Sequence, residues 1–239
     1  MKALILAAGK GTRLKPLTNF LPKALIPLQG RPIISYIIAK IKQTGLKDIG
    51  IVINKRDYRK FKAHLKIPGV RIKYIFQNRA QGTARAVSSA RKFIGKQRFL
   101  LCWCDFISPF DFRKIIRAHQ RFQPSATILI NREKDPSGTA QIKFQGPKIV
   151  KIAEKPKKRF SFWGQTGLLV LEPEIFPVLV SLKPSHKGEY HVPDAVQKLI
   201  DAGKKVRYLK IDTWKVNLNR LDDLWQAVSL MLRSLGQRG

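Results

Sequence analysis

The chain has few acidic residues, two cysteines and no long apolar run. Its 239 residues include 15 Asp and Glu against 47 Lys and Arg, a formal net charge of +32. Cys102 and Cys104 lie too close together for a useful structural disulfide, and no second cysteine pair exists to complete a zinc site. No apolar stretch approaches the roughly 20 residues that a membrane helix needs. These absences argue against a disulfide-stabilised, zinc-binding or helical membrane protein, and they predict buried thiols.

The start of the chain and its histidines add two further absences. Met1 leads directly into an apolar run, which leaves no room for a signal peptide, so we expect a cytoplasmic protein. The four histidines show no metal-ligand spacing.

The excess of positive charge predicts an anionic ligand without naming it. Such a field attracts nucleotides, phosphorylated sugars and nucleic acid. The basic residues are scattered along the chain, with no basic tail and no recognisable RNA-binding motif. Nucleic acid is therefore the less favoured partner, and a general adaptation of surface charge is an alternative explanation.

Apolar runs alternate with helical patterns over the first half of the chain. Strands are predicted at residues 3–6, 49–53, 72–76, 99–104 and 126–131, and helices at 33–45, 56–65, 84–94 and 112–122. This alternation is typical of an α/β, Rossmann-like fold with a mostly parallel sheet and helices on both faces.

Beyond a turn at residues 135–138 the pattern becomes richer in strands. They are predicted at 140–144, 149–154, 168–171 and 206–211, with helices at 173–182, 194–202 and about 221–235. With 44% hydrophobic residues, the chain can bury one good core. We expect a single domain spanning residues 1–239, with a strand-rich substrate lobe in its second half.

A glycine-containing loop follows the first predicted strand. Its glycines allow a tight turn and a close approach of a ligand to bare backbone, whose N–H groups can hold phosphate oxygens. The loop comprises Leu6, Ala7, Ala8, Gly9, Lys10, Gly11, Thr12 and Arg13. Arg13, and Lys23 ten positions later, add charges that can reach the same phosphates. The pattern predicts a triphosphate site, although it matches neither common phosphate-loop motif and such a loop alone is often an ordinary turn.

The extended motif decides between these interpretations. From Gly9 to Tyr36 the chain reads GKGTRLKPLTNFLPKALIPLQGRPIISY, which closely resembles the opening of the sugar-1-phosphate nucleotidyltransferases. The resemblance covers residues 2 to about 232. It implies an enzyme that joins a nucleoside triphosphate to a sugar-1-phosphate with the help of Mg²⁺. Relatives commonly continue into a left-handed β-helix, and we expect no C-terminal β-helix here.

A second motif, Gln77-Asn78-Arg79-Ala80-Gln81-Gly82-Thr83-Ala84, lies between a predicted strand and a helix. A glutamine amide offers a donor and an acceptor together, which suits the imide edge of uracil or thymine. The segment resembles the one with which pyrimidine-using relatives read the base, so Gln77, Gly82 and Thr83 are expected nucleotide-binding residues. The alternative is a plain helix start capped by Thr83.

Asp105 ends a predicted core strand, where ligands bind in open parallel sheets. The resemblance implies that it is the main Mg²⁺ ligand, although Cys104 replaces the usual glycine before it. An ordinary helix cap is the alternative. Asn217 falls where relatives usually have the second metal-binding aspartate, and its neutral amide oxygen is a weaker Mg²⁺ ligand.

The segment Ile152-Ala153-Glu154-Lys155-Pro156 resembles the V-x-E-K-P motif of the family. There the glutamate holds sugar hydroxyls and the lysine holds the sugar phosphate; an exposed turn is the alternative. The resemblance also implies that Ala140, Gln165 and Thr166 line the sugar pocket. Thr139-Ala140 and the segment Gln165-Thr166-Gly167 depart from the family pattern, so the identity of the sugar stays open.

The combined expectation is an enzyme with Arg13, Lys23, Asp105 and Lys155 as its catalytic residues. It would join UTP or dTTP, in preference to purine nucleotides, to a sugar-1-phosphate. No general base is needed, because the attacking phosphate is largely ionised at neutral pH, with a second pKa of about 6. The alternatives are a CTP-dependent transferase for phosphocholine or inositol phosphate, a catalytically inactive nucleotide-binding scaffold, and an RNA-binding protein.

Overall fold

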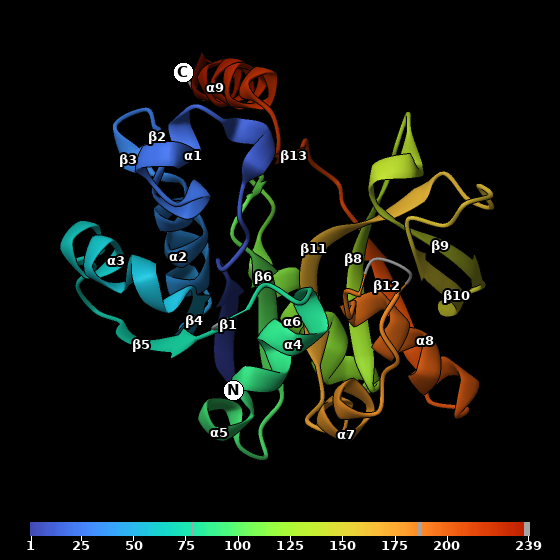
Figure 1. Ribbon diagram of the computed structural model, residues 1–239. Helices are drawn as coiled ribbons and strands as arrows, with labels where there is room; N and C mark the ends of the chain where they lie inside the picture. The colour runs from blue at the N-terminus through green and yellow to red at the C-terminus, as the bar shows by residue number, and fades with distance from the viewer. Residues whose placement is uncertain (78, 186–187, 237–239) are drawn as a thin grey trace.

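The computed structural model describes residues 1–77, 79–185 and 188–236, with a nine-stranded sheet at its centre (Figure 1). In spatial order the strands are β5 (Arg71–Phe76), β4 (Asp48–Ile53), β1 (Lys2–Leu6), β6 (Phe99–Trp103), β11 (Trp163–Leu171), β8 (Ala126–Arg132), β12 (Val206–Lys210), β10 (Lys148–Glu154) and β9 (Ala140–Gln145). Neighbours β5, β4, β1 and β6 are parallel, whereas β11 is antiparallel to both β6 and β8. The predicted α/β fold with a mostly parallel sheet is confirmed, with β10 and β11 as the reversed strands.

Helices cover both faces of this sheet, as predicted (Figure 1). One core cluster packs under α2 (Ile33–Gln43), α3 (Tyr58–His64) and α6 (Phe112–Phe122). The other lies under α4 (Thr83–Ser89), α5 (Arg91–Ile94), α7 (Ile175–Val180) and α8 (Val192–Asp201). Within the described residues, no helix is both long and apolar enough to cross a bilayer.

The local sequence explains why the central elements form. On α2, five isoleucines recur at helical spacing and are all buried, which gives the helix one continuous apolar stripe. On β1, residues 3–6 are buried on both faces, as expected for a parallel strand between two others.

Smaller elements surround the carboxyl edge of β1 and β6. They are the helix α1 (Leu17–Phe20), the 3₁₀ turns η1 (Thr12–Leu14), η2 (Lys23–Leu25), η3 (Lys55–Asp57) and η4 (Pro136–Gly138), and the two-stranded pairs β2 (Pro27–Leu28) with β3 (Arg31–Pro32) and β7 (Phe106–Ile107) with β13 (Val216–Asn217). The long C-terminal helix α9 (Leu221–Gly236) packs against this region through a third apolar cluster.

Three predicted elements differ from the structure. The helix predicted at 84–94 divides into α4 and α5, because Ala90 N–H bonds Val87 O three residues back and tightens the turn. The strand predicted at 168–171 begins earlier, at Trp163, where it pairs with β8 and β9. The helix predicted at 173–182 is shorter: it spans Ile175–Val180, with Glu174 as its N-cap and Ser181 as its C-cap.

Candidate active site

The predicted phosphate loop leaves the carboxyl end of β1, which lies between β4 and β6. Gly11 has a φ of 61°, and a Cβ there would lie 2.9 Å from Cγ2 of Thr18, so the turn requires glycine. A Cβ on Gly9 would meet no atom within 4 Å. The backbone at Gly9 is therefore open to a ligand.

A cavity of about 410 Å³ lies beside this loop. The loop residues that line it are Leu6, Ala8, Gly9, Lys10, Gly11, Thr12 and Arg13, and Lys23 lines it as well. Ala7 does not line the cavity, because it is buried in the core on the α2 side. The loop thus brings together the exposed backbone and three cations that the sequence predicts for phosphate binding.

The predicted base-reading residues line the same cavity. Gln77 is buried, and its Nε2 has no hydrogen-bond partner among the residues that the structure describes, so the amide can still bind a ligand. Gly82 has a φ of 93°, and a Cβ there would lie 2.3 Å from the carbonyl oxygen of Tyr190. The motif residue Asn78 lies outside the described residues.

Thr83 does not cap α4, which is the alternative interpretation of this motif. Gly82 occupies the N-cap position, and no side chain accepts a hydrogen bond there. The hydroxyl of Thr83 accepts instead from Val192 N–H at 3.0 Å, and Ala84 N–H donates to Tyr190 O at 2.9 Å. These bonds hold the start of α4 against the segment that leads into α8, and Thr83 lines the cavity.

Asp105 lies two residues beyond the end of β6 and lines the cavity. It does not cap a helix, since the short strand β7 follows it. Its Oδ2 accepts from Lys23 Nζ at 2.5 Å, and within the described part of the chain its buried Oδ1 has no hydrogen-bond partner. Lys23 also donates to Asn219 Oδ1 at 3.1 Å.

Asn217 reaches the same place from β13, which pairs with β7. The backbone N–H of Leu218 donates to Asp105 O at 3.0 Å, which holds the two segments together. The Nδ2 of Asn217 donates to Thr166 O, and no described residue donates a hydrogen bond to its buried Oδ1. Two buried oxygen atoms without partners, on Asp105 and Asn217, are hard donors of the kind that Mg²⁺ prefers.

These two residues would supply only part of a metal's ligand set. The described part of the chain holds no cluster of three His, Cys, Asp or Glu side chains suited to a metal. Mg²⁺ commonly binds through one or two protein oxygens, together with waters and substrate phosphates. The donor set therefore fits a metal that binds with its nucleotide.

A second, smaller cavity of about 140 Å³ adjoins the first. Glu154 and Lys155 line it, and their side chains form an ion pair at 3.3 Å. Lys155 has a φ of 40°, a left-handed conformation that costs energy in a residue with a Cβ and is often found at functional sites. Ala140 and Gln165, which the resemblance assigns to the sugar pocket, also line this cavity, and Gln165 Oε1 is buried without a hydrogen-bond partner among residues 1–77, 79–185 and 188–236.

Thr166 does not line the second cavity. Its side chain is fully buried and its hydroxyl donates to Leu129 O at 3.0 Å. Successive side chains of a strand point to opposite faces, so Gln165 and Thr166 cannot both face one pocket. Thr166 contributes its backbone carbonyl, which holds Asn217.

The two cavities share one wall. The residues that line both are Arg13, Thr83, Trp103, Asp105 and Asn219. Sequence reasoning did not identify Trp103, Asn219 or His191 as site residues. His191 lines the second cavity. The only sequence signal for Trp103 is its position at the end of a core strand, and no local pattern marks Asn219 or His191.

Neither thiol is suited to nucleophilic chemistry. Burial raises the pKa of the Cys104 thiol to about 12, and the nearby carboxylate of Asp105 adds to this effect. Burial also raises the pKa of Cys102. Both cysteines therefore remain protonated at neutral pH, as the sequence predicted for buried thiols.

Comparison with known proteins identifies the family. Residues 2–234 match the sequence model of the nucleotidyl transferase family. The chain belongs to this family. The resemblance to sugar-1-phosphate nucleotidyltransferases is thereby confirmed.

Individual relatives are similar over most of the chain. The glucose-1-phosphate thymidylyltransferase of Streptomyces griseus is 29% identical, over 100% of this chain and 68% of its own. The UTP–glucose-1-phosphate uridylyltransferase AglF of Haloferax volcanii is 28% identical over 95% of both chains. A solved structure described as a glucose-1-phosphate thymidylyltransferase of Bacillus anthracis superposes with a TM-score of 0.87 at 30% identity, covering 96% of this chain and 94% of the other.

Proposed function

We propose that the protein transfers a nucleotidyl group from UTP or dTTP to a sugar-1-phosphate and releases pyrophosphate. One observation carries the proposal: the glycine-loop cavity and the cavity of Glu154 and Lys155 meet at Arg13 and Asp105. In this arrangement a triphosphate and a second phosphorylated substrate could bind in adjacent cavities that share one wall. The names of the relatives, which specify sugar phosphates and thymidylyl or uridylyl transfer, support the same substrates.

In the proposed reaction, an oxygen of the sugar phosphate attacks the α-phosphorus of the triphosphate. A new P–O bond forms, the bond from the α-phosphorus to the bridging oxygen of the β-phosphate breaks, and that oxygen leaves with pyrophosphate. The attacking phosphate is largely ionised at neutral pH, with a second pKa of about 6, so no side chain must remove a proton. Catalysis then consists of alignment and charge neutralisation.

The residues divide this work between the two cavities. The backbone of residues 9–12 and the side chain of Arg13 hold the triphosphate, and Gln77 with Gly82 reads the pyrimidine. Lys23 and Lys155 place the attacking phosphate, and Glu154 holds sugar hydroxyls. Trp103 forms part of the wall that both substrates contact.

A metal completes the proposed site. Asp105 and Asn217 would hold Mg²⁺ through their two buried Oδ1 atoms, to which no residue that the structure describes donates a hydrogen bond. When bound, Mg²⁺ supplies positive charge that stabilises the negative charge on the reacting phosphates.

The decisive experiment is a pyrophosphate-release screen of UTP, dTTP, CTP, GTP and ATP against a panel of sugar-1-phosphates, with phosphocholine and inositol phosphate included. Release with UTP or dTTP and a hexose-1-phosphate is the expected result. Release only with CTP and a non-sugar phosphate would overturn the substrate assignment. Binding of nucleotide without turnover on any pair would show a scaffold in place of an enzyme.

A further inference from the structure

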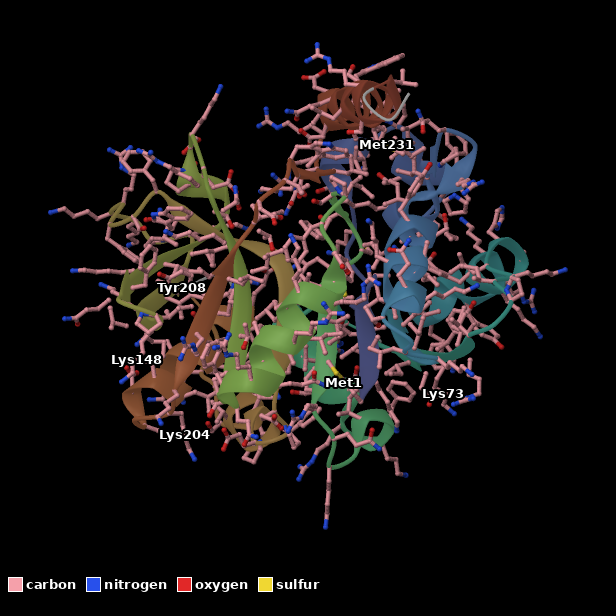
Figure 2. The ribbon with its side chains drawn as sticks, turned by 180° about the vertical axis from the view of Figure 1, so that it is seen from behind. Met1, Lys73, Lys148, Lys204, Tyr208 and Met231 are labelled. Carbon is pink, nitrogen blue, oxygen red and sulfur yellow. The ribbon has the colours of Figure 1, made fainter. Side chains whose placement is uncertain are left out.

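The outer strands of the sheet carry a concentrated positive charge, of which the proposed catalytic site uses only Lys155. Residues 140–171 contain seven Lys and Arg and one acidic residue, Glu154, which pairs with Lys155. Residues 203–210 contain four Lys and Arg and no acidic residue. Figure 2 shows this lobe beside α6, with long nitrogen-tipped side chains projecting outward, and Lys148 labelled at its edge.

Strand register places four of these cations on one face in opposed pairs. Lys143 of β9 lies directly opposite Lys151 of β10, and Lys148 of β10 lies directly opposite Arg207 of β12. Their chain neighbours Ile142, Ile149, Ile152 and Val206 are buried on the other face of the sheet, in the α8 side of the core. All four cations therefore share the face on which α6 packs, and we call them the basic face.

This arrangement is unfavourable in the isolated protein. Like charges directly opposite on neighbouring strands repel and destabilise the pairing. Within the part of the chain that the structure describes, none of the four forms an ion pair with a carboxylate, whereas basic residues elsewhere do, such as Arg71 with Asp48. Opposed Cα atoms lie roughly 5 Å apart, so one phosphate can contact both cations of a pair.

Aromatic rings border the basic face and are stacked by its cations. The guanidinium carbon of Arg207 lies 3.7 Å from the ring centroid of Phe122, a half-exposed residue at the end of α6. Arg121 lies 5.2 Å from the same ring, and Lys151 Nζ lies 4.7 Å from the ring of Phe160. Because a cation covers each ring, these rings do not expose the bare apolar surface that enters a membrane interface. A flat guanidinium lying on an aromatic ring instead offers a surface on which nucleic-acid bases stack.

We propose that the basic face binds single-stranded nucleic acid. Backbone phosphates contact the opposed cation pairs, and a base stacks on the layer formed by Arg207 and Phe122. The binding is electrostatic and tolerant of sequence, because the face presents point charges and a stacking surface without a defined set of base-reading groups. This inference is independent of the proposed enzymatic function, since none of the four cations lines the catalytic cavities.

The test measures binding of a fluorescein-labelled oligouridylate by anisotropy, with UTP and MgCl₂ in excess to fill the nucleotide site. Four neutralised phosphates give a slope of log K against log salt of about −2.8, so a fourfold rise in salt lowers the affinity roughly 50-fold. The variant Lys143→Gln/Lys148→Gln/Lys151→Gln/Arg207→Gln is expected to lose at least about tenfold in affinity and most of this slope. Its turnover should remain that of the wild type.

The matched control removes the same charge from a different surface. Lys55, Arg59, Lys62 and Lys66 are exposed on η3, α3 and the residues after it, and their replacement by Gln should leave most of the affinity. Equal losses in both variants would show general charge attraction and overturn the proposal. The same would follow if the basic-face variant kept its affinity, or if phosphatidylserine vesicles bound through this face and the oligonucleotide did not.

Two further measurements do not depend on the fourfold variant folding. Ultraviolet cross-linking of the wild-type complex should map to Phe122 or to the strands of the basic face; cross-links confined to the catalytic cavity would contradict the proposal. The smaller variant Lys148→Gln/Lys151→Gln should keep or raise the melting temperature at low salt, because it relieves both opposed pairs. A lower melting temperature would show that these lysines stabilise the free protein, contrary to the argument.

Discussion

The ammonium of Lys23 lies 2.5 Å from Oδ2 of Asp105 in the first cavity, and Asp105 lines the second cavity as well. Both side chains are largely buried, so each compensates a charge that would be costly if left alone. In the proposed reaction, however, Lys23 holds a phosphate and Asp105 holds a metal. The ion pair therefore describes the site before substrates bind, and Lys23 must be able to exchange one anionic partner for another.

The first prediction follows from this pairing. Lys23→Gln should lower turnover about 100-fold, since a charged group on the reacting phosphates is lost. It should also raise the affinity of the nucleotide-free protein for Mn²⁺ or Mg²⁺, because the carboxylate of Asp105 loses its counter-charge. Calorimetric titration with the metal alone measures this second effect. The control is Lys10→Gln, which alters the same cavity at a residue that does not bond Asp105. An unchanged metal affinity in Lys23→Gln would show that Asp105 does not bind the metal.

The second prediction concerns Asp105 itself. Asp105→Ala should reduce turnover by two or more orders of magnitude, the scale of losing a main electrostatic group. Circular dichroism should show a retained fold, because Lys23, which loses its counter-charge, still donates to Asn219 Oδ1. The matched variant Asp105→Asn keeps one oxygen donor and should retain more activity than Asp105→Ala. Near-normal turnover in Asp105→Ala would contradict the metal assignment.

The third prediction separates backbone access from stability. Gly9→Ala introduces a Cβ that meets no protein atom within 4 Å, so the melting temperature should stay near that of the wild type. The same Cβ would obstruct a ligand that approaches the bare backbone, and the KM for the triphosphate should rise about tenfold, equivalent to about 1.4 kcal/mol. Gly11→Ala is the contrasting variant: its Cβ would lie 2.9 Å from Thr18, and it should lower stability as well. Normal nucleotide affinity in Gly9→Ala would argue against a backbone-bound triphosphate.

Local patterns predicted the elements that carry this loop, and the physical reason is burial. The isoleucine stripe of α2 and the continuous apolar run of β1 are buried against the core. Each pattern is complete within a short stretch of sequence, so the sequence alone predicts both elements. The pairing of β7 with β13 could not be predicted in this way, because two-residue strands have no periodicity. The same holds for the contact of Lys23 with Asn219, which joins residues 196 positions apart.

The site residues show the same division. Arg13, Lys23 and Asp105 belong to dense motifs, and the structure brings them together. The motif comparison assigns Thr166 to the pocket with Gln165, although strand alternation allows only one of the two to face it. His191 and Trp103 enter the cavity wall through tertiary packing, which a single sequence without structure does not reveal.

The fourth prediction is a pH dependence of stability that arises from His119. Its ring is fully buried, with Nδ1 2.9 Å from Thr127 Oγ1 and Nε2 3.1 Å from Glu172 Oε1. Burial lowers the pKa of His119; Glu172 partly opposes this effect, and Arg98, which also binds Glu172, lowers the pKa further. Below the ordinary histidine pKa of about 6.5, the unfolded chain therefore binds a proton that the native protein does not.

Stability from this group is complete above that value and falls as the pH drops toward the lowered native pKa. The slope of the unfolding free energy should approach at most about 1.4 kcal/mol per pH unit. Urea denaturation between about pH 5.5 and pH 8 measures it. His119→Gln should flatten the profile, whereas His64→Gln, on the exposed surface of α3, should leave it unchanged. A profile that stays equally steep in His119→Gln would assign the effect to other groups.

The fifth prediction is the choice of base. Gln77 is buried in the nucleotide cavity with its Nε2 unpaired, so its amide can meet the imide edge of uracil or thymine with a matched donor and acceptor. An amide can rotate to suit cytosine as well, so the close backbone at Gly82, fixed against Tyr190, must set the preference.

We expect UTP or dTTP to exceed GTP and ATP in kcat/KM by at least roughly tenfold, about 1.4 kcal/mol of differential transition-state binding. Gln77→Ala should reduce this ratio more than it slows the better substrate, and it should cost little stability because Nε2 has no protein partner to lose. A wild-type preference for GTP would overturn the base assignment while leaving the phosphate site in place.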